Sequence, residues 1–266
     1  MIRDITLGQY YPSDSILHRL DPRVKLSGTM LYILSLFLFD SFYGYIIATI
    51  FLGSMIILSK VPFSFMVKGL KAVVILLVFT AVLNMLFTPG EILWQWKFIT
   101  ITKQGIRTAA FMIIRLIYLI VGSSLMTLTT TPSNLTDGLE KGLGFLKKVK
   151  VPVHEIAMMM SIALSFIPIL VEELDKIMKA QQARGADFES GNIIKRAKSM
   201  IPILVPLFVS SFRRANDLAM AMEARCYRGG EGRTKMKPLI YKKQDYLAYF
   251  VLFIYIAAVI AIGIIF

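Results

Sequence analysis

The chain has 266 residues, of which 56% are hydrophobic, and it carries a formal net charge of +13. The apolar share exceeds the roughly 45–50% of soluble domains, which argues against a soluble enzyme and favours an integral membrane protein. The basic excess fits the positive-inside bias, an anionic lipid surface or an acidic protein partner, and no aromatic-interleaved basic motif points to nucleic acid.

Five apolar segments are candidates for membrane-spanning helices. A span takes about 17–25 mainly apolar residues, and in chain order the segments are Val24–Phe39, Tyr43–Leu58, Ala72–Phe87, Ala109–Leu128 and Tyr246–Phe266. We therefore expect an all-α integral membrane protein in three parts. An N-terminal membrane domain with four spans occupies 1–131, a cytoplasmic domain of long amphipathic helices occupies 132–245, and a last span occupies 246–266.

Lysine and arginine positions give the orientation, because cytoplasmic links carry an excess of both. Basic residues precede the first span and recur between the second and third, namely Arg3, Arg19, Arg23, Lys25, Lys60, Lys68 and Lys71. The link around residues 40–44 has none, so we predict a cytoplasmic N-terminus and an outer C-terminus. The outer link 88–107 holds Lys97, Lys103 and Arg107 against this bias, and its Trp94 and Trp96 are typical of an interfacial belt.

The segment 131–245 carries 19 Lys and Arg against 12 Asp and Glu, and it contains two further apolar runs, 156–171 and 200–210. The second run is too short to span and is interrupted by Pro202 and Pro206. If both runs crossed the membrane, six basic residues between them would lie outside: Lys176, Lys179, Arg184, Lys195, Arg196 and Lys198. The positive-inside bias therefore favours a cytoplasmic or interfacial helical domain.

Three helices are predicted in this domain. The first begins at Pro132-Ser133, with Ser133 as N-cap, and runs to about Leu146; the second covers about Val153–Gln182 and the third about Asn192–Glu223. The second helix has an apolar stripe at three- and four-residue steps: Ile167, Leu170, Val171, Leu174, Ile177 and Met178. The third has a similar one: Leu204, Phe208, Phe212, Ala215, Leu218, Ala219 and Met222.

These two long helices end alike, in Ala183-Arg184-Gly185 and in Ala224-Arg225-Cys226, and each follows a copy of IPIL at 167–170 or 201–204. An arginine between small residues can enter a groove and meet a carboxylate with two parallel hydrogen bonds. One such cation would be explained by favourable interaction with the helix C-terminus. Two matching tips in one basic domain instead suggest that each tip inserts, as a plug, into a groove on a partner protein. Two tips then require two such grooves, which we call sockets.

No catalytic, metal or cofactor motif is present in the sequence. GLEKGLG at 138–144 only superficially resembles a phosphate-binding loop, and His18 and His154 have no metal-ligand context. Cys226 is the only cysteine, so no disulfide within the chain is possible. Arg115 lies inside the fourth predicted span, where either a structural pairing or a functional role explains it.

Four stretches resemble the transmembrane T component of energy-coupling factor transporters. They are GQYYPSDSILHRLDPRVKL (8–26), VPVHEIAMMMSIALSFIP (151–168) with KAQQARGADF (179–188), and SSFRRANDLAMAMEARCYRGGEGRT (210–234). The likeness covers nearly the whole chain. One departure is Cys226, where glycine is expected. Arg225 is intact, so the resemblance still implies docking at this tip, and a helix ending either like or unlike the first is compatible with the change.

The resemblance implies a non-catalytic coupling subunit of a vitamin-uptake transporter in the cell membrane. Two cytoplasmic ATPases would bind ATP and dock on the two tips, Ala183-Arg184-Gly185 and Ala224-Arg225-Cys226. A small membrane S component would bind the amphipathic faces, through Met158, Met159, Met160, Leu174, Met178, Phe208 and Phe212. The unequal arms favour two different ATPases, and the methionines favour exchangeable S components.

Two other functions fit the sequence less well. A permease that lines a substrate path needs polar residues through several spans. The predicted spans contain few polar residues. A membrane transferase acting on an anionic lipid needs clustered acidic or histidine residues at the basic face, whereas Glu155, Asp187 and Asp217 are scattered. The vitamin, and whether one S component or several are served, stay open.

Overall fold

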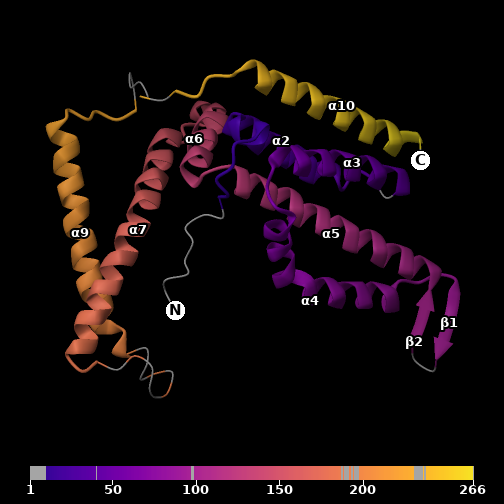
Figure 1. The fold of residues 1–266 in the computed structure, drawn as a ribbon, viewed down its shortest axis with the longest axis horizontal. Coiled ribbons are helices and arrows are strands. Elements are labelled where there is room, and N and C mark those ends of the chain that lie inside the picture. Colours follow the sequence, from indigo (N-terminus) through magenta and orange to yellow (C-terminus); the bar gives the residue numbers. More distant parts are fainter. Residues whose placement is uncertain are drawn as a thin grey trace. The chain divides into compact units, whose positions relative to one another are not determined.

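The computed structural model describes residues 10–39, 41–96, 99–186, 188, 192, 194, 198–230, 236 and 238–265. Six residues named in the sequence analysis lie outside this set: Arg3, Lys97, Asp187, Lys195, Arg196 and Phe266. The described chain is almost entirely helical (Figure 1), which confirms the predicted all-α class. It forms two compact units: a membrane unit of Gly8–Gly142 with Leu239–Phe266, and an arm unit of Leu143–Pro238.

The membrane unit contains seven helices and one hairpin among its described residues. They are α1 (Ile16–Arg19), α2 (Pro22–Ser35), α3 (Phe42–Ser59), α4 (Phe63–Phe87), β1 (Ile92–Trp96), β2 (Ile99–Thr102), α5 (Lys103–Thr129), α6 (Pro132–Gly142) and α10 (Lys243–Ile265). Helices α4 and α5 pack together, and α2 contacts α5, α6 and α10. The last helix therefore returns to the first long one.

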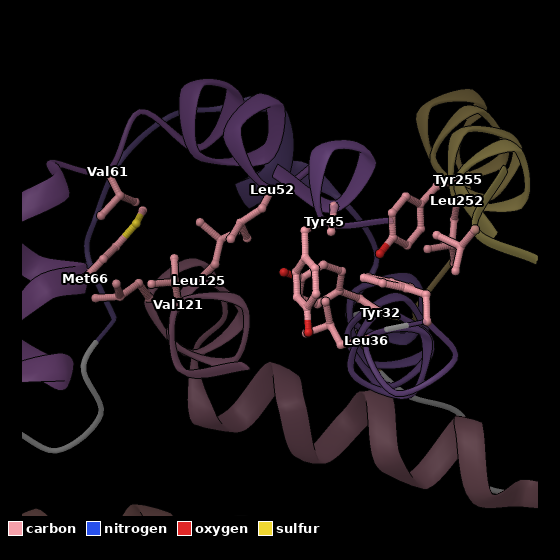
Figure 2. Close-up of a cluster of buried hydrophobic side chains, with 14 residues drawn as sticks. Tyr32, Leu36, Tyr45, Leu52, Val61, Met66, Val121, Leu125, Leu252 and Tyr255 are labelled. Carbon is pink, nitrogen blue, oxygen red and sulfur yellow. The ribbon is translucent and has the colours of Figure 1, made fainter. Parts of the chain in front are cut away.

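The core of this unit is aromatic and aliphatic, and it joins helices far apart in sequence. Tyr32 of α2, its C-cap residue Leu36, Tyr45 of α3, Val121 of α5 and Tyr255 of α10 are all buried in it. Figure 2 shows Tyr255 and Leu252 of α10 beside Tyr32, and the Phe51 and Tyr255 rings stack with centroids 4.1 Å apart. Such contacts hold α10 against the N-terminal helices.

A network of polar contacts fixes the start of α2. The Asp21 carboxylate caps the helix by accepting from the Arg23 N–H and forms an ion pair with the Arg23 guanidinium at 2.9 Å. The buried Asp245 carboxylate, at the start of α10, accepts from the Asp21 N–H at 2.8 Å and the Lys242 N–H at 2.7 Å. The motif DPRVKL spans residues 21–26. Much of it is explained by the capping of α2 and by the attachment of α2 to α10.

His18 has the ordinary polar contacts expected of a structural histidine. Its Nε2 lies 3.0 Å from the Tyr11 carbonyl and its Nδ1 lies 2.7 Å from the Ser15 hydroxyl. Burial lowers the pKa of the His18 imidazole, so the ring is neutral near pH 7. It ties α1 to the preceding segment.

Three predicted spans coincide with helices that are long and apolar enough to cross a membrane: Phe42–Ser59, Lys103–Thr129 and Lys243–Ile264. The predicted span Val24–Phe39 is a helix only to Ser35, which leaves α2 with 14 residues. Helix α4 has 25 residues and contains the whole predicted span Ala72–Phe87. Helix α7 of the arm unit (Val153–Ala183) also qualifies by length and composition, so its predicted interfacial placement stays a prediction.

The link between α4 and α5, for which no element was predicted, contains an antiparallel hairpin in which Trp96 pairs with Ile99 and Gln95 with Thr100. Its aromatic and β-branched residues, in ILWQW and ITIT, are typical of strands. The predicted cap and end of the helix that follows Thr131 were wrong. At α6, the cap is Thr131 rather than Ser133, because the Thr131 hydroxyl accepts from the Asn134 N–H at 3.3 Å. Helix α6 ends at Gly142, short of Leu146.

Arg115 has a structural contact inside the membrane unit. Its guanidinium donates to the Phe39 carbonyl at 3.0 Å and lies 5.5 Å from the centroid of the Phe37 ring. The arginine on α5 thereby satisfies a carbonyl in the turn after α2. This contact favours the structural pairing over a functional role.

Candidate docking site on the two arms

The arm unit is built on two long helices that run antiparallel. After the 3₁₀ segment η1 (Leu143–Val149), helix α7 (Val153–Ala183) packs against α9 (Ile201–Ala224). The Gln181 side chain at the end of α7 donates to the Pro202 carbonyl at the start of α9, at 3.3 Å. Further along, Arg214 pairs with Glu173 at 2.9 Å. Figure 1 shows the two helices crossing near the end of α7.

Helix α9 presents different faces to α7 and to its surroundings. Ile203 is buried and Arg214, Leu218 and Met222 are half-buried, whereas Leu204, Phe208 and Phe212 are exposed. The single predicted stripe of α9 therefore divides, with Leu218 and Met222 on the more buried side. On α7 the predicted stripe is half-buried along its whole length.

Both arms end in the same backbone motif. After α7 the Gly185 N–H donates to the Gln182 carbonyl at 2.9 Å and the Ala186 N–H to the Gln181 carbonyl at 3.0 Å. After α9 the Cys226 N–H donates to Glu223 at 2.8 Å and the Tyr227 N–H to Met222 at 3.0 Å. These pairs of bonds define a Schellman motif, in which one residue takes the left-handed conformation.

That residue is Gly185 in the first arm, with φ +87°, and Cys226 in the second, with φ +57°. The cysteine at the position where glycine was expected does not change the helix ending. The cost of a side chain in the left-handed region, about 1 kcal/mol, is accepted here and the ending is retained. Arg184 and Arg225 consequently occupy equivalent C-cap positions.

All six tip residues are exposed, from Ala183 to Gly185 and from Ala224 to Cys226. Within the described chain, neither the Arg184 nor the Arg225 guanidinium has an ion-pair or hydrogen-bond partner. An arginine offers five N–H donors in a planar fork that matches a carboxylate. The tips are therefore free cations flanked by small residues, as a plug requires.

The tips lie at opposite ends of the antiparallel pair. Arg184 closes α7 near the start of α9, and Arg225 closes α9 near the start of α7, where Met158 and Met222 line one depression. A helix of 24 residues, the length of α9, is about 36 Å long. One groove of ordinary size cannot receive both arginines, which favours two separate sockets.

The seven residues predicted to contact an S component fall into two groups. Met159 and Met160 on α7 and Phe208 and Phe212 on α9 are exposed, and the two phenylalanine rings are 5.7 Å apart. Met158, Leu174 and Met178 are half-buried. The exposed group includes the most accessible part of the α9 stripe, where Phe208 and Phe212 are each 64% exposed.

One candidate feature was missed in the sequence. Arg228 lies beside Arg225 on the rim of the depression between α7 and α9, and Gly230 packs directly on the His154 ring. The signal was present in RCYRGG, where a second arginine follows three residues after the first. Across the described residues, no three His, Cys, Asp or Glu side chains come together as a metal site.

Comparison with known proteins places these features in a family. Residues 13–236 match the family model CbiQ, described as cobalt transport protein. The chain is 58% identical over 250 residues to the energy-coupling factor transporter transmembrane protein EcfT of Clostridium kluyveri, covering 93% of both chains. It is 56% identical to EcfT of Acidaminococcus fermentans, covering 93% of this chain and 92% of the relative.

The EcfT of Bacillus subtilis is 48% identical, over 92% of this chain and 93% of that one. Together with the membrane-length helices α3, α5 and α10, these matches identify a multi-pass membrane protein. The chain therefore belongs to the family of energy-coupling factor transporter transmembrane proteins.

Proposed function

We propose that this chain couples two cytoplasmic ATPases to a substrate-binding membrane subunit in an energy-coupling factor transporter. The observation that carries the proposal is the pair of equivalent C-cap arginines at opposite ends of α7 and α9. Each would insert into a groove of one ATPase and meet a carboxylate there. The names of the relatives support the transporter class.

The antiparallel arms are suited to transmit movement between their ends. A helix is stiff along its axis, and the Glu173–Arg214 pair and the Gln181–Pro202 contact tie α7 to α9 at two levels. A displacement of one ATPase would therefore move both helices. We propose that ATP is bound by the ATPases and that this chain holds no cofactor of its own.

The exposed apolar residues of the arms suit a membrane partner. Phe208, Phe212, Met159 and Met160 present a hydrophobic and adaptable surface, because the unbranched methionine side chain repacks easily. We propose that an S component binds there. Rearrangement of the arms would then alter its contacts and release the substrate inwards.

The proposed orientation places the N-terminus and both arms in the cytoplasm. It is supported by the basic residues before the first span and by the 19 Lys and Arg of segment 131–245. A permease role for this chain alone has less support, because the membrane unit has an aromatic and aliphatic core. No described cluster of acidic and histidine side chains supports a lipid transferase.

Measuring ATP hydrolysis by the purified chain and by its complex tests whether the ATPases, and not this chain, hydrolyse ATP. We expect the isolated chain in detergent to show no hydrolysis above a protein-free blank, because its sequence has no phosphate-binding loop. The complex recovered with its ATPases is expected to hydrolyse ATP. Turnover by the isolated chain that withstands further purification would contradict the proposal.

A further inference from the structure

The segment that joins α6 to α7 is both basic and apolar. Residues 141–150, which we call the basic linker, read KGLGFLKKVK, so four of the ten are lysines and none is acidic. Phe145 is 63% exposed and Val149 is 71% exposed. The side chains of Lys141, Lys148 and Lys150 are exposed as well, and none of them has a hydrogen-bond or ion-pair partner in the part of the chain that the structure describes.

Chain connectivity places the basic linker close to the membrane. Helix α6 begins three residues after the end of α5, which is long and apolar enough to cross a membrane. Helix α6 also packs on the first turn of α2, where a Cβ atom at Gly138 would lie 2.9 Å from the Pro22 Cβ. Phe145 follows Gly138 by seven residues, which reach about 25 Å at most in a fully extended chain. The linker therefore lies within reach of the level at which α2 and α5 enter the membrane.

The composition of the linker favours a partner that is both anionic and apolar. Basic segments next to a span are attracted to anionic headgroups, and exposed aromatic side chains among lysines are typical of segments that lie in the headgroup region. A lysine can bury its methylene stem there while its ammonium group stays at the phosphates. A purely apolar partner would leave the exposed ammonium groups without counter-charges, which is costly. An anionic lipid surface covers Phe145 and Val149 and also supplies the counter-charges.

We propose that the basic linker binds anionic phospholipids at the membrane face. Phe145 and Val149 enter the headgroup region, and the three exposed lysines pair with phosphate oxygens. The boundary between the membrane unit and the arm unit falls inside the linker, between Gly142 and Leu143, so lipid holds the point at which the arms begin. The inference goes beyond the proposed function, because lipid binding requires neither an ATPase nor an S component.

Fluorescence quenching by lipids tests the proposal in the full chain. Phe145→Cys is labelled with bimane in the Cys226→Ser background, and the matched control carries the label on Lys179→Cys, at an exposed position of α7. Each chain is reconstituted into vesicles of phosphatidylcholine, with or without phosphatidylglycerol, that contain lipids brominated near the headgroup. We expect quenching at position 145 to be about twofold stronger with phosphatidylglycerol and to persist in the complex recovered with its partner subunits, while position 179 stays unquenched. Absent quenching at position 145, quenching equal in the two lipids or at the two positions, or quenching lost in the complex would overturn the proposal.

Removing the charges separates lipid binding from the wider function. The linker variant combines Lys141→Gln, Lys148→Gln and Lys150→Gln in the chain labelled at position 145, and its control combines three exposed positions of α7 and α9, Lys176→Gln, Lys179→Gln and Arg213→Gln. We expect the linker variant to lose the extra quenching with phosphatidylglycerol and the control to keep it.

Recovery of ATPases in detergent is measured on the same variants and should match the unchanged chain. If the linker variant keeps its lipid dependence, or loses the ATPases, the linker is not a lipid-binding surface. If the unchanged chain recovers no ATPase while the linker variant alone loses the lipid dependence, the proposed function fails and the lipid inference stands.

Discussion

Replacing both tip arginines, Arg184→Glu with Arg225→Glu, is expected to abolish recovery of the ATPases with this chain. Each change removes a donor fork and places a carboxylate against the acidic group of the socket. Loss of one charge-paired interface anchor costs about 2–5 kcal/mol, or roughly 30- to several-thousand-fold in affinity. Two losses at separate sockets leave no stable contact, and uptake of the substrate stops with them.

The control is a double change of equal charge on the same arms, Lys179→Glu with Arg213→Glu. Both residues are exposed and neither belongs to a tip. Co-purification of ATPases with this control should match the unchanged chain, and the thermal stability of both variants should be alike. Undiminished recovery of ATPases with the Arg184/Arg225 variant would show that the tips are not plugs.

Asp245→Ala is expected to cause the largest loss of stability in the membrane unit. The carboxylate is 1% exposed and accepts from two backbone N–H groups, of Asp21 and Lys242. Its removal leaves the buried Asp21 N–H without a partner, at about 1–3 kcal/mol, and takes the acceptor from the Lys242 N–H, which is only part-buried. We expect the free energy of unfolding to fall by about 2–3 kcal/mol.

Thermal unfolding of the purified chain in detergent measures this loss, with Asp14→Ala as the control. Asp14 also accepts from an arginine, Arg19, but both side chains are mostly exposed, so its removal should leave the midpoint almost unchanged. Limited proteolysis should show α10 released from α2 only in the Asp245 variant. Equal midpoints for the two variants would refute the role of Asp245.

Much of the site could be predicted because it depends on short-range sequence features. A long apolar-periodic helix followed by Ala-Arg-Gly predicts both the C-cap arginine and the glycine that takes a left-handed conformation. The sequence did not decide whether Cys226 would keep this ending, and the structure shows that a Schellman motif tolerates a cysteine in the left-handed conformation. The likeness of the tips was thus greater than their sequences suggest.

Long-range contacts could not be predicted in the same way. Nothing near Asp245 in the sequence indicates that it binds the Asp21 N–H, 224 residues away. The depression beside Arg225 likewise depends on α7 and α9 running antiparallel, and on Gly230 meeting His154. The α9 stripe was found by its period, but which half faces α7 is decided by packing.

The cytoplasmic position of the tips is tested most directly by the native thiol of Cys226, the only cysteine of the chain and an exposed one. A membrane-impermeant maleimide is applied to sealed cells and to inverted membrane vesicles stripped of peripheral subunits. Controls are Cys226→Ser alone and Cys226→Ser with Leu93→Cys, which moves the thiol to the hairpin of β1 and β2, predicted to lie outside. We expect Cys226 to react only in the vesicles and the thiol at position 93 only in the cells; reaction of Cys226 in sealed cells would contradict docking of the arms on cytoplasmic ATPases.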